Sequence, residues 1–359
     1  MPFIQQQEHN QSRWSLVNVK NLIKALPKAE QHVHIVGSIR PDTLLWVAEE
    51  GGIKKPFETA GDARRFFQYR DFPHFISTYC MVVDCITKED QFERITYELL
   101  EHDARCNVRY VEASFSAPDH VRRGLDYGLM LNAINSGANH ARSDFGIECN
   151  LRVDLVRNYG ADDAMETLNW IKNKRDNVVS VDLGGSEERF PPRPFEPVYR
   201  RAKEMSLHMV AHAGEAAGPE SIWDTVKYLN VEHIGHGVAA SLDPKLMSYL
   251  EDHEITIEAC PVSNLRTGAV SSLQRHPIRT FFERGLSVTV STDDPSMFGT
   301  DMNNEYLQLH KNLKFTIPEL FRLSLSAVDS SFLPKENRFN MHESFIEEYQ
   351  HLTGTRFEF

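Results

Sequence analysis

The chain has 359 residues, of which 51 are acidic and 39 are basic, and its formal net charge is -12. This length suits one large domain, and the acidic balance argues against nucleic acid as a partner because such a surface repels a phosphate backbone. The sequence holds no run of about 18 apolar residues, so no membrane-spanning helix is predicted.

The start of the chain reads as a polar N-terminal extension, residues 1–20, followed by a single domain over residues 21–359. The extension lacks the apolar segment of a signal peptide. The 5 cysteines are scattered and form no C-x-x-C pattern, which is typical of reduced thiols. We therefore expect a cytoplasmic protein, and we predict no particular oligomeric state.

Short runs rich in β-branched residues alternate with longer segments that carry apolar residues at helical spacing. The predicted strands are Ala29 to Ile35, Val108 to Phe115, Glu148 to Leu155, Val178 to Leu183, His208 to Ala213, His233 to Gly237, Thr256 to Cys260 and Ser287 to Thr292. The predicted helices are Pro41 to Glu50, Asp90 to Arg105, Leu125 to Arg142, Ala161 to Lys174, Glu196 to Met205, Pro219 to Leu229, Pro244 to Asp252 and Pro277 to Arg284. Extra helix, from Asp62 to Tyr79, is predicted as an insertion after the first unit.

This alternation predicts a parallel sheet, and its repetition predicts closure into an α/β fold of the (β/α)8 TIM-barrel type. Active sites of this fold lie where the strands end and the following loops begin. Acidic and histidine side chains stand at those ends in four separate motifs. They are His32 and His34 in A-E-Q-H-V-H, His212 and Glu215 in H-A-G-E, His236 in I-G-H-G, and Asp293 and Asp294 in V-S-T-D-D-P.

The residue types of these motifs are those of a zinc site. Zinc accepts imidazole nitrogen and carboxylate oxygen, and a catalytic zinc leaves one position for water. His32 and His34 are two apart on a predicted strand and therefore point to one face. Three histidines and one aspartate match this ligand set, which leaves Glu215 and His236 as proton-transfer groups.

Each motif alone also has an ordinary structural explanation. Sixteen histidines produce roughly 0.7 H-x-H pairs by chance in a chain of this length. A lone histidine such as His212 or His236 is usually structural, Asp294 can begin a turn, and Glu215 can be a first-turn helix carboxylate. Their joint position at the strand ends of one barrel favours the functional interpretation.

The motifs L-P-K-A-E-Q-H-V-H-I-V-G-S-I-R-P, H-A-G-E, I-G-H-G and S-T-D-D-P resemble the adenosine deaminase family of the amidohydrolase superfamily. The resemblance runs from about Leu22 to the C-terminus. It implies one zinc ion per chain. The implied ligands are His32, His34, His212 and Asp293.

The resemblance also implies roles for other residues in a reaction on a 6-aminopurine. Glu215 would protonate purine N1, His236 would orient and deprotonate the attacking water, and Asp294 would hydrogen-bond that water or purine N7. Gly185 would meet purine N3 through its backbone N–H. The family usually reads D-L-A-G-D-E at this point, so Gly184 and Ser186 depart from its pattern.

This chemistry is consistent with the residues present. Zinc lowers the pKa of bound water from about 15.7 to roughly 7, which supplies a nucleophile for C6 of the purine. The products would be ammonia and the 6-oxo purine. One metal is favoured over two, because Leu183, Gly184 and Gly185 at the end of the fourth strand offer no bridging side chain. The H-x-E and P-C-x-x-C motifs of the other zinc deaminases are absent.

Substrate preference is predicted from position 36. Adenosine-specific members read H-V-H-L-D-G, which implies an aspartate that binds the ribose 5′-hydroxyl, whereas this chain has Val36. The V-G-S version, with D-F-P-H-F-I, H-V-R-R-G and H-A-G-E-A-A-G-P-E, resembles the branch that deaminates 6-amino-6-deoxyfutalosine in menaquinone synthesis. That substrate is a purine nucleoside with a carboxyphenyl ketone at its 5′ end.

We hypothesise that Phe72 and Phe75 line an apolar wall for this group and that Arg122 or Arg123 binds its carboxylate. As alternatives, the phenylalanines can be helix core and the arginines solvated cations. Adenosine, methylthioadenosine and adenine are alternative substrates. A different metal-dependent amidohydrolase is a further alternative, and a non-catalytic binding barrel ranks lowest because no ligand is missing.

Overall fold

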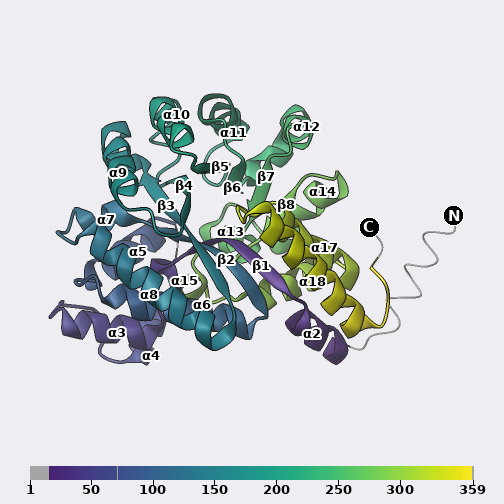
Figure 1. Cartoon of the computed structure of the whole chain (residues 1–359), viewed down its shortest axis with the longest axis horizontal. Coiled ribbons are helices and arrows are strands. Elements are labelled where there is room, and N and C mark those ends of the chain that lie inside the picture. Colours follow the sequence, from purple (N-terminus) through teal and green to yellow (C-terminus); the bar gives the residue numbers. More distant parts are fainter. Residues whose placement is uncertain (1–15, 71, 358–359) are drawn as a thin grey trace.

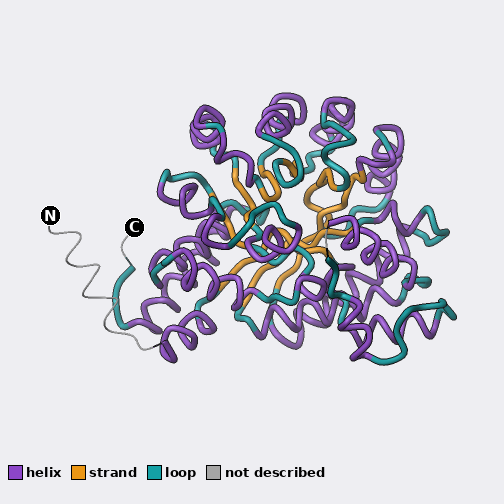
Figure 2. The backbone as a smooth tube through the Cα atoms, turned by 180° about the vertical axis from the view of Figure 1, so that it is seen from behind, coloured by secondary structure: helices purple, strands orange, loops and turns teal. Residues whose placement is uncertain are grey.

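The computed structural model describes residues 16–70 and 72–357. Helices surround a central group of strands, as Figures 1 and 2 show from opposite sides. The strands pair in parallel in chain order, and a parallel bridge between Val33 and Asp293 brings the last strand beside the first. The strands are β1 (Lys28–His34), β2 (Val108–Phe115), β3 (Glu148–Val156), β4 (Val178–Gly184), β5 (His208–Ala213), β6 (His233–His236), β7 (Thr256–Ala259) and β8 (Val288–Val290).

The (β/α)8 barrel predicted from the sequence is therefore confirmed. No strand end differs from its predicted position by more than 2 residues. Strand residues such as Val111, Val153 and Ile257 are buried, because side chains inside the barrel cover one face of the sheet and helices cover the other.

The helices around the barrel follow the predicted segments closely. They are α3 (Pro41–Glu50), α6 (Gln91–Arg105), α8 (Tyr127–Phe145), α9 (Ala161–Asn173), α10 (Glu196–Glu204), α11 (Pro219–Asp224), α12 (Pro244–Asp252) and α14 (Ile278–Glu283). The segment predicted as one helix from Pro219 to Leu229 changes to a π-helical turn at Thr225. Among the described helices, none combines the length and apolar character needed to span a bilayer.

The inserted helix predicted from Asp62 to Tyr79 is present as two helices, α4 (Ala60–Phe66) and α5 (Phe72–Cys85), with a break between them. Helix α4 begins at a capping box in which Thr59 and Asp62 bond each other's backbone N–H. Pro73 stands near the start of α5, where proline is tolerated, but it would break a helix that continued through it.

Other helices lie outside the predicted units. Helix α2 (Leu16–Ala25) overlaps the end of the expected extension, and residues 1–15 are outside the described part of the chain. Short helices follow the ends of four strands, and longer helices form the C-terminal part of the chain. They are α7 (Ala117–Val121), α13 (Pro261–Thr267), α15 (Pro295–Phe298), α16 (Met302–Leu313), α17 (Ile317–Asp329) and α18 (Lys335–Thr353), together with the 3-10 turn η1 (Val36–Ser38).

A buried ionic network fills the barrel below the strand ends. Arg152 Nη2 lies 2.7 Å from Glu112 Oε2 and 2.6 Å from Glu258 Oε1, and all three side chains are fully buried. His233 Nδ1 lies 2.7 Å from the same Glu258 oxygen. A buried charge is tolerated only when it is paired, and here each one is. These contacts fix the position of the Glu258 carboxylate, which points toward the first strand.

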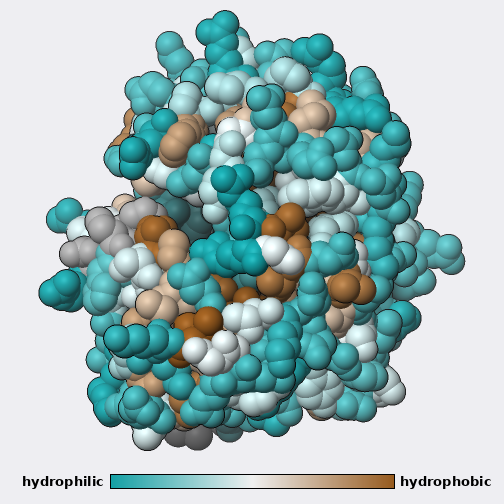
Figure 3. Space-filling view, turned by 90° about the vertical axis from the view of Figure 1, so that its left-hand side faces the viewer, coloured by the Kyte–Doolittle hydropathy of each residue, from teal (hydrophilic) through white to brown (hydrophobic). Residues whose placement is uncertain are grey.

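A cavity of about 1220 Å³ opens at the end of the barrel where strands β5, β6 and β7 begin. His208, Glu232, His233 and Phe332 are among the residues that line it. None of the candidate site residues does, so this cavity is separate from the four motifs. The opposite side of the molecule, which carries α5 and α7, faces the viewer in Figure 3 and shows a recess among mixed hydrophobic and hydrophilic side chains.

Candidate metal centre and active site

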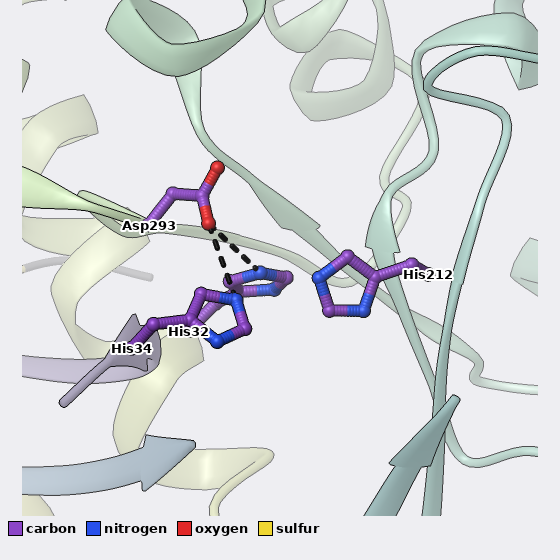
Figure 4. A group of neighbouring side chains, drawn as sticks. All are labelled: His32, His34, His212 and Asp293. Carbon is purple, nitrogen blue, oxygen red and sulfur yellow. Dashed lines mark ion pairs between the residues drawn. The ribbon is translucent and has the colours of Figure 1, made fainter. Parts of the chain in front are cut away.

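The four predicted ligands meet at one point. His32 and His34 come from β1, His212 from β5, and Asp293 from the segment after β8. One ligand atom of each residue lies within 4.8 Å of those of the other three. Asp293 Oδ1 is 3.6 Å from His32 Nε2 and 3.3 Å from His34 Nε2, and Figure 4 shows the rings converging. Residues that are 261 positions apart in the sequence are thus neighbours because β1 and β8 adjoin.

The outer nitrogens of the three rings are held by buried carboxylates. His32 Nδ1 is 3.1 Å from Glu258, His212 Nδ1 is 3.0 Å from Asp182, and His34 Nδ1 is 3.5 Å from Asp154. This is the usual support of metal-binding histidines, because it leaves the lone pair of Nε2 directed at the ion.

The inner side of the cluster fits a cation. His32 Nε2 is buried and has no hydrogen-bond partner, which is costly unless a ligand completes it. Burial would lower the pKa of His32, but the neighbouring carboxylates of Asp293 and Glu258 outweigh it and raise that pKa to about 10. The carboxylates therefore favour positive charge at this point. Three imidazoles and a carboxylate form a donor set that suits zinc.

Glu215 and His236 lie beside the cluster. Glu215 Oε2 is 3.5 Å from His236 Nε2. Burial raises the pKa of the Glu215 carboxyl to about 8, and the charges of Asp293 and Glu187 add to the rise. A pKa raised in this way lets Glu215 hold a proton near neutral pH, the state that a proton donor requires. His236 ends β6, and burial lowers its pKa well below the usual value.

A hydrogen-bonded chain behind His236 sets the position of its proton. Asn264 Nδ2 donates to His236 Nδ1 over 3.0 Å, and Asn264 Oδ1 accepts from His276 Nε2 over 3.0 Å. The neutral His236 ring therefore carries its proton on Nε2, toward Glu215. Sequence reasoning missed Asn264, which lies on the short helix α13, and His276, because neither residue belongs to a motif of distinctive spacing.

Glu187, which sequence reasoning also missed, holds the turn that carries Glu215. Its carboxylate accepts the backbone N–H of Gly214 at 2.5 Å, of Ala216 at 2.9 Å and of Ala217 at 3.1 Å. The Ser221 hydroxyl donates to it at 2.5 Å. A carboxylate surrounded by so many donors fixes the turn after β5 in one conformation.

Asp294 and Gly185 lie in strained or crowded surroundings. Asp294 is buried with Oδ1 unpaired, and burial followed by the charge of Asp293 raises its pKa to about 8. A Cβ atom at Gly37 would lie 1.6 Å from Asp294 Oδ1, so only glycine fits there. Gly185 has φ +102°, a conformation that other residues rarely adopt, and it follows β4 directly.

The candidate substrate-binding residues lie in different parts of the structure. Val36 is buried in η1, immediately after β1. Phe75 stacks on Phe298 at 5.0 Å, and α15 containing Phe298 follows Asp293 and Asp294, so Phe75 is at the edge of the site. The side chain of Phe72 lies outside the described part of the chain.

The two candidate arginines have acidic partners of their own. Arg122 Nη1 is 2.9 Å from Asp163 Oδ2, and the guanidinium lies over the Tyr159 ring. Arg123 Nε is 2.7 Å from Asp84 Oδ1. A substrate carboxylate would therefore have to compete with a resident carboxylate for either cation.

A parallel barrel with a His-His-His-Asp cluster at its strand ends, flanked by an acid and a further histidine, defines a metal-dependent hydrolase. The adenosine deaminase family model matches residues 27–348. The chain belongs to the adenosine deaminase family, and the resemblance seen in the sequence motifs is thereby confirmed.

Individual relatives agree with this assignment. The aminodeoxyfutalosine deaminase of Streptomyces avermitilis is 37% identical over 322 residues, 88% of this chain and 89% of that protein. The crystal structure of adenine deaminase from Arthrobacter aurescens matches with a TM-score of 0.87 and 29% identity, over 92% of this chain and 100% of that one. An amidohydrolase from Burkholderia ambifaria with bound zinc matches with a TM-score of 0.88 and 26% identity, over 95% of each chain.

These findings make the chain a hydrolase that acts on C–N bonds, with deaminase activity on adenine-like or adenosine-like substrates. Enzymes of this family are metal-dependent, and the His-His-His-Asp cluster is a group that can bind the metal.

Proposed function

We propose that the protein is a zinc-dependent deaminase of a 5′-modified 6-aminopurine nucleoside, such as 6-amino-6-deoxyfutalosine. The observation that carries the proposal is Val36, a buried apolar residue in the turn directly after the two β1 histidines. Similarity to an aminodeoxyfutalosine deaminase supports it. The protein would then act in menaquinone synthesis in the cytoplasm, where its free cysteines stay reduced.

His32, His34, His212 and Asp293 would hold the zinc ion, which when bound lowers the pKa of water and so supplies the nucleophile. Glu215 would donate its proton to purine N1 as the water oxygen bonds to C6, and so neutralise the charge that develops on the ring. His236 would orient the water through its Nε2–H. Because Nε2 already carries a proton, the neutral ring would not also take the proton of the water, as the resemblance implied. Asp294 would bind the water or purine N7. Gly185 N–H would meet N3. The C6–N bond then breaks. One proton of the water joins the leaving amino group to form ammonia and the other returns to Glu215, so one water is consumed and one ammonia is released.

Val36 would face the 5′ position of the ribose. A hydroxyl left unpaired against valine costs about 1 to 3 kcal/mol, whereas an apolar 5′ substituent loses nothing there. Phe75, and by prediction Phe72, would extend this apolar surface. The role given to Arg122 or Arg123 remains a prediction.

The Val36→Asp variant is expected to shift preference toward adenosine, because aspartate can accept a hydrogen bond from the 5′-hydroxyl. The ratio of kcat/KM for adenosine to that for 6-amino-6-deoxyfutalosine should rise by roughly 5- to 150-fold. Val36→Thr, which keeps the side-chain shape, is the milder companion and should move the ratio in the same direction. An unchanged ratio in both folded variants would mean that position 36 does not face the ribose.

The proposal as a whole is tested by comparing turnover of 6-amino-6-deoxyfutalosine, methylthioadenosine, adenosine and adenine, with ammonia release measured directly. The highest kcat/KM is expected for 6-amino-6-deoxyfutalosine. Efficient turnover of adenosine or adenine with no gain from a 5′ group would contradict the proposed substrate. Turnover without ammonia would contradict deamination itself.

A further inference from the structure

A third arginine, Arg266, lies on the helix that is anchored to the candidate active site. Helix α13 begins directly after β7, and Ser263 Oγ donates to Asp293 Oδ2 over 2.6 Å. The next residue, Asn264, bonds His236. Arg266 follows Ser263 by three positions, so both side chains lie on the same side of the helix. Arg266 is therefore one helical turn from a residue that touches a metal ligand.

The guanidinium of Arg266 lies over the ring of Tyr69, 5.4 Å from its centroid. Tyr69 packs against Phe75 at 5.1 Å and against Phe298 at 6.0 Å. We call Tyr69, Phe75 and Phe298 the aromatic rim. Phe298 belongs to α15, which follows Asp293 and Asp294, so the aromatic rim borders the acidic end of the site. An apolar substituent that extends out of the site on this side would contact the aromatic rim first and the Arg266 guanidinium next.

Arg266 also differs from the other two arginines in its charge partners. Its side chain is exposed, and within residues 16–70 and 72–357 no carboxylate forms an ion pair with it. Arg122 and Arg123 are paired with Asp163 and Asp84. An anion at Arg266 would have no resident carboxylate to displace. The contact with Tyr69 holds the planar guanidinium in place for bidentate binding of a carboxylate.

We propose that Arg266 and the aromatic rim form a subsite for an anionic group carried on an apolar 5′ substituent of the nucleoside. The carboxylate would bind the guanidinium, and the apolar spacer would lie along Tyr69 and Phe75. This inference rests on the proposed function, because it assigns a binding site to the outer end of the 5′ substituent that Val36 admits. It makes the enzyme selective for nucleosides with a negatively charged 5′ extension.

The test compares Arg266→Gln with the unaltered enzyme on two substrates, 6-amino-6-deoxyfutalosine and the uncharged methylthioadenosine. A charge-assisted hydrogen bond contributes about 1.5 to 3 kcal/mol, so kcat/KM for the anionic substrate should fall roughly 10- to 150-fold, mainly through KM. Turnover of methylthioadenosine should change less than about twofold. Arg266→Lys, which keeps the charge, should recover part of the loss. Arg275→Gln, an exposed arginine nearby in the sequence, is the matched control and should behave as the unaltered enzyme.

Equal loss on both substrates, or loss on neither, would overturn the subsite. Selective loss in Arg122→Gln or Arg123→Gln, with Arg266→Gln unaffected, would overturn it in favour of those arginines. The proposed function is tested separately with the unaltered enzyme, because its ratio of kcat/KM for the two substrates does not depend on any variant. Metal content and circular dichroism confirm that each variant is folded and loaded.

Discussion

Replacing Glu215 with glutamine is expected to lower kcat by on the order of 100- to 10,000-fold, the usual contribution of a positioned proton donor. Burial and the charges of Asp293 and Glu187 raise the pKa of Glu215 to about 8, so the carboxyl can hold a proton at neutral pH. Glutamine has nearly the same shape but cannot release a proton to the purine ring. Single-turnover measurement of ammonia release is the appropriate assay, since it reports the chemical step.

Metal content should remain at the unaltered level in Glu215→Gln, because Glu215 is not among the four converging ligands. Glu220→Gln is the matched control, since Glu220 is exposed on α11 five positions further along. A Glu215→Gln enzyme with more than about a tenth of the original kcat would exclude Glu215 as the proton donor, given the usual size of that contribution.

Replacing Asp293 with asparagine is expected to remove most of the bound metal and, with it, the activity. Asp293 would supply the only anionic ligand atom of the cluster among the described residues, and its carboxylate lies within 3.6 Å of two of the clustered histidines. Loss of an outer partner of a ligand typically costs about 10- to 100-fold in metal affinity or activity, so loss of a ligand should cost more than about 100-fold. Metal analysis of the purified variant, together with kcat/KM, measures both effects.

Asparagine is the suitable replacement because Asp293 has φ 67°, a conformation that asparagine tolerates well. The backbone at this position should therefore survive the change. Asp243→Asn is the control: Asp243 caps α12 and is not among the four clustered residues, and asparagine caps a helix equally well. If Asp293→Asn bound metal and turned over substrate normally, the residue would not be a ligand.

The barrel and the metal cluster could both be predicted from the sequence for the same reason. Parallel strands that are buried on both faces appear in the sequence as short runs of β-branched residues. The fold requires the carboxyl ends of these strands to lie together at one end of the barrel. His32, His212 and Asp293 each stand at such an end, so chain position alone indicated that they converge. The local sequence pattern was sufficient because closure of the barrel brings the ends of strands that are distant in sequence together.

The groups that support the cluster could not be predicted in this way. Glu187 and Asn264 support the site through hydrogen bonds to Gly214 and His236, which lie 27 and 28 positions away, and neither residue stands in a local motif that indicates this role. Arg122 and Arg123 looked available for a substrate carboxylate, but their acidic partners lie 41 and 39 positions away in the chain. The sequence analysis did not single out Arg266, because its contact with Tyr69 depends on how the segment between α4 and α5 packs against α13.

Deamination by this protein is expected to require one metal ion, held by the four converging residues. The most direct measurement is to strip the protein of metal, add zinc in steps, and follow ammonia release from the nucleoside at each step. Activity should be absent at the start, rise in proportion to added zinc, and level off at about one ion per chain, as a mononuclear site requires. Full activity in the stripped protein, or a rise in activity that continues to a second ion, would contradict a requirement for one bound ion.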